Sequence, residues 1–201
     1  MTQWNEEGRL QGHGDSALTA QGIKDAEALA ELMKQYPIDT IYSSPLTRAY
    51  QTACLVFPNR SILTDERLKE MSFGDYEGRY VSELLDLKDY DALWNHPEAF
   101  DRIPHGESYA EVYARLHSFL EDLHSLKGEH HIFMAIHGML YVILMSIIKE
   151  VPIKELTTLN QSIIRGGALT IVSLKDHRYQ LLKEAIDTHL DEAKTISYTK
   201  K

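Results

Sequence analysis

The chain has 201 residues, of which 43% are hydrophobic and 25% charged, and its formal net charge is −9. This composition is typical of a folded domain with an ordinary core and argues against global disorder. The negative charge argues against partners such as nucleic acid or an anionic membrane, because its field repels phosphate polymers. The single cysteine, Cys54, excludes an internal disulfide framework and favours a reducing, cytoplasmic location. Its apolar neighbours predict that it is buried.

The first helix is predicted through residues 23–35, with Asp15 or Thr19 as its cap. Its apolar residues recur at helical spacing, and charged residues lie opposite them. The residues expected on its buried face are Ile23, Ala26, Ala30 and Met33.

Strand and helix patterns then alternate along the chain. In order, they predict a strand at 37–44, a helix at 45–57, a strand at 60–65, a helix at 81–87, a helix at 108–126, a strand at 130–138, a buried helix at 139–148, strands at 168–174 and 179–185, and a loose tail at 195–201. The polar first residues do not resemble a signal peptide, and the apolar helix is too short to span a bilayer.

Alternating strands and helices predict an α/β fold, a doubly wound and mostly parallel sheet. We expect one domain over residues 1–201, with a small inserted helical subdomain at 75–107. In such sheets ligands bind outside the carboxyl ends of the strands, so residues just past a strand are the best candidates for chemistry.

Three side chains occupy such positions, each at a different strand–helix junction. Arg48 can donate two N–H groups to phosphate oxygens, and His137 can donate a hydrogen bond to a developing phosphoryl charge. Glu70 can give a proton to a leaving oxygen or take one from water. Taken singly, each also fits a structural histidine, a solvated arginine or an ordinary surface acid, so only their coincidence indicates phosphoryl transfer.

The remaining histidines are weaker candidates. His130 and His131 are adjacent before a strand, so they point to opposite faces and do not share a metal. No HExxH motif or cysteine cluster is present, so we predict no metal site and no cofactor. His13 lies between two glycines in a predicted tight turn, at the rim of the pocket or exposed.

Five motifs carry a family resemblance: TQWNEEGRLQGHGDSALTAQG, IYSSPLTRAYQTA, DERLKEMSFGDYEG, PHGESYAEV and IHGML. Their order and spacing resemble the histidine phosphatase superfamily, the phosphoglycerate mutase-like proteins, nearly from end to end. The resemblance implies that a histidine of an Arg-His-Gly motif attacks the phosphoryl group and forms a phosphohistidine. It also implies that Arg48 is a second phosphate-binding arginine, His137 a second pocket histidine and Glu70 the proton donor. The residues it places against substrate are Asn5, Gln11, Gly12 and Gly138.

The resemblance places the Arg-His-Gly motif immediately before Met1, and the 201 residues do not contain it. We therefore expect Met1 to be an internal methionine of a longer protein, and the first, interior strand of the sheet to be missing. Without that strand we expect a widened or rearranged sheet, pairing with another copy, or a gap lined by water. We also expect negligible turnover from this polypeptide.

The resemblance favours a phosphomonoesterase acting on a small phosphate ester, because the segment between Gly78 and Glu107 is short for a mutase. A cofactor-dependent phosphoglycerate mutase and a non-catalytic pseudophosphatase that binds its ligand are the alternatives. Self-association through an unpaired strand edge is a further expectation. Four aromatic residues can either cover the leaving group or pack the small subdomain: Tyr76, Tyr80, Tyr90 and Trp94.

Overall fold

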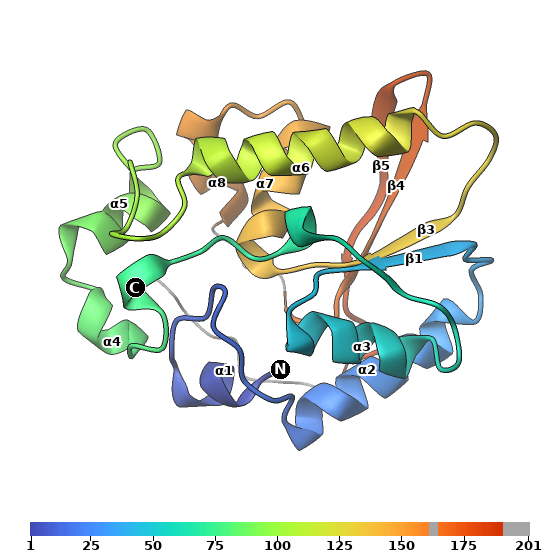
Figure 1. The fold of residues 1–201 in the computed structure, drawn as a ribbon, viewed down its shortest axis with the longest axis horizontal. Coiled ribbons are helices and arrows are strands. Elements are labelled where there is room, and N and C mark those ends of the chain that lie inside the picture. The colour runs from blue at the N-terminus through green and yellow to red at the C-terminus, as the bar shows by residue number, and fades with distance from the viewer. Residues whose placement is uncertain (161–164, 191–201) are drawn as a thin grey trace.

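A parallel sheet forms the centre of the computed structural model, which describes residues 1–160 and 165–190 (Figure 1). Its strands are β1 (Thr40–Ser43), β2 (Leu63–Thr64) and β3 (Ile132–Ala135), in the order β2-β1-β3. The register of β1 and β3 runs from Thr40 opposite Ile132 to Ser43 opposite Ala135. The predicted α/β class with a parallel sheet is confirmed. The predicted tail at 195–201 lies outside the described residues.

Helices cover both faces of this sheet, as a doubly wound fold requires (Figure 1). On one face, Ile41, Phe133 and Ala135 pack with α2 (Ala20–Met33) and α3 (Thr47–Val56). On the other face, Tyr42 and Met134 contact a larger cluster built around α6 (Tyr109–His124) and α7 (Gly138–Ile148). The alternation of side chains along each strand thus supplies two separate apolar layers.

The buried helix predicted at 139–148 is α7, and apolar residues surround it on several sides. Among its buried side chains are Leu140, Ile143 and Met145. Its predicted burial is confirmed, and this explains why its sequence lacks a polar face. No helix of the described residues, α7 included, has the length and apolarity needed to cross a membrane.

The two C-terminal strands form a separate antiparallel sheet. Strands β4 (Leu169–Lys175) and β5 (Arg178–Ile186) pair through a two-residue turn at Asp176 and His177, both of which have positive φ. A two-residue turn with positive φ at both positions matches the right-handed twist of the paired strands. Glycine or asparagine is usual at such positions, but here they are an aspartate and a histidine. In the described part of the chain, no ladder joins this hairpin to β3, so the strands form two sheets and not one. Whether this separation reflects a missing interior strand stays a prediction.

Two predictions of burial on helix faces are wrong. Ile23 is 40% exposed and Ala30 is only half-buried, because the buried stripe of α2 is formed by Gly22, Asp25, Ala26, Leu29 and Met33. Cys54 is exposed, because α3 packs through Ala49, Ala53 and Val56 and turns its other side to solvent.

The segment predicted as an inserted subdomain contains two short helices, α4 (Val81–Leu84) and α5 (Lys88–Asn95). Its apolar side chains join the cluster around α6 and α7 and do not form a core of their own. Its status as a distinct subdomain stays a prediction. The described residues also include the short α-helices α1 (Gln3–Glu7) and α8 (Thr157–Asn160).

Candidate active site

Arg48, Glu70 and His137 come together at the carboxyl end of the parallel sheet. His137 directly precedes α7 after β3, Arg48 lies in the first turn of α3 after β1, and Glu70 follows β2 through a short turn. All three side chains are buried. Burial raises the pKa of Glu70 and lowers that of His137, and the charge of Arg48 opposes the first shift and adds to the second, so the three groups share one electrostatic environment.

The Glu70 carboxylate caps the start of α7. It accepts backbone N–H groups from Met139 at 3.0 Å and Leu140 at 2.9 Å, and from its neighbour Met71 at 2.9 Å. These amides are the unsatisfied donors of a helix N-terminus, where a carboxylate is favoured. Burial nevertheless raises the pKa of Glu70, because its effect outweighs the three N–H groups and the charge of Arg48, which lower this pKa. A raised pKa suits a carboxyl group that gives up and takes back a proton.

His137 is held as a neutral imidazole. Burial first, then the charges of Arg48, Arg115 and His13, holds its pKa well below the ordinary histidine value. Within the described residues its Nε2 atom is buried and has no hydrogen-bond partner. A buried polar atom without a partner is costly, and this nitrogen is one that can form a hydrogen bond with a bound molecule.

Arg48 joins the polar N-terminal loop to the sheet. Its Nη2 donates to the Gly12 carbonyl at 2.7 Å and its Nη1 to the Gly14 carbonyl at 3.0 Å, and Asp15 lies 3.5 Å from Nη1. Burial lowers the pKa of Arg48, while the Glu70 and Asp15 carboxylates act in the opposite direction. A guanidinium carries five N–H groups in a planar fork, a geometry that can contact an anion in addition to these carbonyl and carboxylate groups.

Of the other predicted binding residues, Asn5 and Gln11 use their side chains for contacts inside the N-terminal segment. The side-chain carbonyl of Asn5 closes the capping box of α1, and Gln11 bonds the hydroxyls of Thr2 and Ser16. Gly138 is the exposed first residue of α7. Gly12 lies at Arg48 and Gly138 follows His137, while a contact of any of the four residues with substrate stays a prediction.

Glu77 is a residue that the sequence interpretation missed. Its carboxylate accepts the backbone N–H groups of His13 at 2.9 Å, Gly14 and Phe73 at 2.9 Å, so it joins the N-terminal loop to the segment after Glu70. The signal was present in the quoted motif DERLKEMSFGDYEG, where an acid precedes a glycine in a turn-rich stretch.

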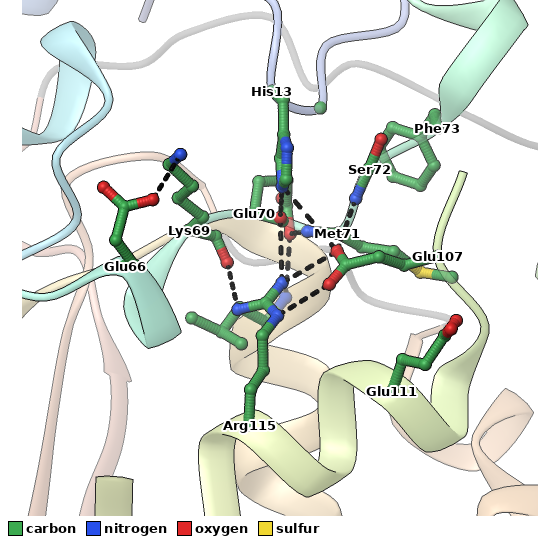
Figure 2. Close-up of polar contacts among 12 residues, drawn as sticks. His13, Glu66, Lys69, Glu70, Met71, Ser72, Phe73, Glu107, Glu111 and Arg115 are labelled. Atoms are coloured by element: carbon green, nitrogen blue, oxygen red, sulfur yellow. Dashed lines mark hydrogen bonds and ion pairs between the residues drawn. The ribbon is translucent and has the colours of Figure 1, made fainter. Parts of the chain in front are cut away.

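Arg115 and Glu107 were also missed, and they lie directly behind Glu70 (Figure 2). His13 approaches from the opposite side, where its Nε2 bonds the Glu70 carbonyl at 2.9 Å and lies 3.7 Å from Glu107. The predicted exposed or rim position of His13 is confirmed, because its side chain is 39% exposed. Among the residues that the structure describes, no cluster of His, Cys, Asp or Glu is arranged to hold a metal ion.

A cation, a neutral imidazole and a buried carboxyl at the end of a parallel sheet are groups suited to an enzyme that handles a phosphate ester. The chain belongs to the histidine phosphatase superfamily (branch 1), which matches residues 1–187. The family predicted from the five motifs is thus confirmed.

Relatives and solved structures agree with this assignment. "Putative phosphoserine phosphatase 2" of Hydrogenobacter thermophilus is 38% identical over 146 residues, 71% of this chain and 72% of the relative. "Probable phosphoglycerate mutase GpmB" of Enterobacter sp. is 36% identical over 155 residues, 75% of this chain and 72% of the relative. The structure of Bacillus stearothermophilus YhfR superposes with a TM-score of 0.85 at 29% identity, over 94% of this chain and 95% of that one.

His137→Gln should make the protein less sensitive to acid. The unfolded chain takes up a proton at this histidine below the ordinary histidine pKa of about 6.5 while the folded chain does not, so folding loses stability there as the pH falls. Removing the imidazole should flatten the decline in the free energy of unfolding by up to about 1.4 kcal/mol per pH unit. Urea unfolding followed by circular dichroism, between about pH 7 and pH 5, measures this slope.

His117→Gln is the matched control, because that side chain is 50% exposed on α6. It should leave the slope as in the parent protein. Equal slopes for the parent and the His137 variant would contradict the buried, neutral state of His137.

Gly12→Ala should destabilise the loop that Arg48 and Glu77 hold. A Cβ at residue 12 would lie 2.4 Å from a Glu77 carboxylate oxygen and 2.7 Å from the Met71 carbonyl. We expect a loss of about 1–3 kcal/mol in the free energy of unfolding, as for other overpacked sites. Gly166→Ala, where nothing lies within 4 Å, should change it by less than about 0.5 kcal/mol. Similar unfolding midpoints in urea for the two variants would contradict this tight fit.

Proposed function

We propose that this protein is a phosphomonoesterase for a small phosphorylated metabolite, acting through a phosphohistidine intermediate. The observation that supports it is the convergence of Arg48, Glu70 and His137, with a buried His137 nitrogen that has no partner in the described residues. Arg48 and His137 offer hydrogen bonds to phosphoryl oxygens. Glu70 offers an exchangeable proton beside them.

The proposed reaction has two steps. In the first, a histidine nitrogen of an Arg-His-Gly motif forms a bond to phosphorus, the ester P–O bond breaks, and the Glu70 carboxyl protonates the departing alkoxide. In the second, water attacks the phosphohistidine, the P–N bond breaks, and the Glu70 carboxylate takes the proton of the water. Arg48 and His137 stabilise the phosphoryl oxygens in both steps.

His137 is not the proposed nucleophile. The 201 residues contain three His-Gly pairs, at 13–14, 105–106 and 137–138, and none follows an arginine. We propose that the nucleophile comes from an Arg-His-Gly strand outside these residues and that the chain as given turns over negligibly.

The proposed substrates are phosphate esters of small carboxylic acids. The names of the two relatives refer to phosphoserine and phosphoglycerate, which are both phosphate monoesters of three-carbon acids. An aromatic leaving group is less favoured, because Tyr90 and Trp94 are buried in the main core and only Tyr80 of the four aromatic residues is well exposed. A phosphoglycerate mutase stays the second candidate, on the name of the second relative.

Phosphate release should require the Arg-His-Gly strand. The test compares the 201-residue chain with a form preceded by a strand ending in Arg-His-Gly and with a matched form ending in Arg-Ala-Gly. With phosphoserine and 3-phosphoglycerate as substrates, the first extended form should exceed the other two on the order of a thousandfold or more.

Equal turnover by all three proteins would refute the phosphohistidine mechanism. Transfer of phosphate between hydroxyls faster than its release would make the protein a mutase. Binding of inorganic phosphate by every form, with no turnover by any, would favour the non-catalytic pseudophosphatase.

We also propose that the 201-residue chain self-associates and that the protein is cytoplasmic. In the described sheet β3 is an edge strand, and an open edge is a template for pairing with another chain. Sedimentation velocity should show dimers or larger species that the Arg-His-Gly strand converts to monomer. A monomer at all concentrations would contradict this. The cytoplasmic location is supported by the single cysteine, and recovery of the protein outside the cytoplasmic fraction of its cells would contradict it.

A further inference from the structure

The Arg115 guanidinium, on α6, donates all its hydrogen bonds to Glu107 and to the backbone of residues 67–70. Nε donates to Glu107 at 2.9 Å and Nη2 to the other oxygen of Glu107 at 3.0 Å. Nη1 donates to the carbonyls of Arg67 at 2.7 Å and Lys69 at 2.8 Å, and Nη2 also donates to the carbonyl of Glu70 at 2.9 Å. These bonds occupy every N–H group that a guanidinium has. Figure 2 shows the contacts from Arg115 to Glu107 and to the backbone of Lys69 and Glu70.

Glu107 makes this arrangement rigid. Its carboxylate pairs with Arg115 in the two-pronged geometry that is stronger than a single contact, and it also accepts the N–H of Ser72 at 2.8 Å. The Arg115 side chain is only 17% exposed. The segment from Arg67 to Ser72 is thus held at both ends to α6, whose buried face lies in the main core.

Glu70 lies in the middle of residues 67–72, the segment that Arg115 and Glu107 hold in place. Its carbonyl accepts Arg115 on one side and His13 on the other, at 2.9 Å each. Its carboxylate must at the same time reach the amides of Met139 and Leu140, which follow His137. A small rotation of this backbone would move the carboxylate away from α7, because its three accepted N–H groups come from two different segments.

We propose that Arg115, oriented by Glu107, is the positioning residue of the active site, setting where the Glu70 carboxyl lies relative to α7 and His137. The proposal rests on the proposed function, since the position of Glu70 affects turnover only where Glu70 transfers a proton. Arg115 touches no reacting atom and acts through the backbone of residues 67–70. A lysine cannot replace it, because one ammonium nitrogen does not reach acceptors spread across a planar fork.

The test uses the 201-residue chain and three variants, Arg115→Gln, Arg115→Lys and Glu107→Gln. Arg67→Gln is the matched control, because the Arg67 side chain ties the same segment to α6 through Asp122 at 2.7 Å and Ser118 at 3.2 Å. Its other polar partner among the described residues is Asp65, so it does not bond Glu70. Two readouts are independent of activity: amide hydrogen exchange at Met139 and Leu140, and the ¹³C titration of the Glu70 carboxyl by NMR.

In the Arg115 variants, exchange at Met139 and Leu140 should accelerate about tenfold or more while core amides of α6 change less, as in local opening. The pKa of Glu70 should fall toward its ordinary value, because a displaced carboxyl meets water. Loss of the Arg115 charge alone would raise that pKa, so the sign of the change separates displacement from simple electrostatics. Glu107→Gln should show the same changes in smaller size, and Arg67→Gln neither.

Uniform acceleration at all core amides, an unchanged or raised Glu70 pKa, or equal effects from Arg67→Gln would overturn the proposal. In the form carrying the Arg-His-Gly strand, Arg115→Lys should lower kcat about tenfold or more with KM little changed. If that form hydrolyses no phosphate ester even without substitutions, the proposed function fails while the NMR result still decides the role of Arg115.

Discussion

The site depends on the buried carboxylate of Glu70 at the start of α7. Burying a carboxylate is expensive unless it is well hydrogen-bonded, and here three backbone N–H groups and a nearby guanidinium offset the cost only in part, as the raised pKa shows. This contact fixes the segment after β2 to the junction of β3 and α7. It also means that the N-terminal amides of Met139 and Leu140 are occupied by the protein itself, so the helix end does not offer these amides to a phosphate.

The N-terminal loop is assembled by two opposite charges. The Glu77 carboxylate accepts backbone N–H groups from residues 13 and 14, and the Arg48 guanidinium donates to the carbonyls of residues 12 and 14. Each charge satisfies the backbone groups that the other cannot, which a loop without regular structure needs when it is partly buried. The lack of a side chain at Gly12 allows this close approach. Arg48 is therefore a structural tie as well as the cation of the site.

Local sequence patterns predicted most helices and strands and the three residues Arg48, Glu70 and His137. They failed to predict side-chain burial where it depends on contacts between residues far apart in the sequence. The strand before His137 and the buried α7 follow from short apolar runs, and Arg48 and Glu70 follow from their places after strands. The exposure of Ile23 and Cys54 depends on which side of a helix docks, and two similar stripes were available. The burial of Tyr90 and Trp94 depends on how the segment folds back on α6 and α7. The hydrogen bonds of Arg115 to the carbonyls of Arg67 and Glu70 join residues more than forty positions apart in the chain. A periodic pattern within a short stretch of sequence cannot predict such contacts.

The pairing of charges around the site explains how a chain of net charge −9 can bind a phosphate ester. Most charges around the site are already matched: Arg115 by Glu107 and carbonyl groups, Glu77 by amides, and Glu70 by amides beside Arg48. Among the described groups at the site, the buried Nε2 of His137 has no hydrogen-bond partner, and the charge of Arg48 acts on this histidine. Since cationic neighbours and burial keep His137 neutral, an anion bound between it and Arg48 would raise its pKa and draw a proton onto it. By linkage, binding of a phosphate group beside His137 and protonation of His137 would favour one another, so the surroundings that keep His137 neutral would accept a proton together with the anion.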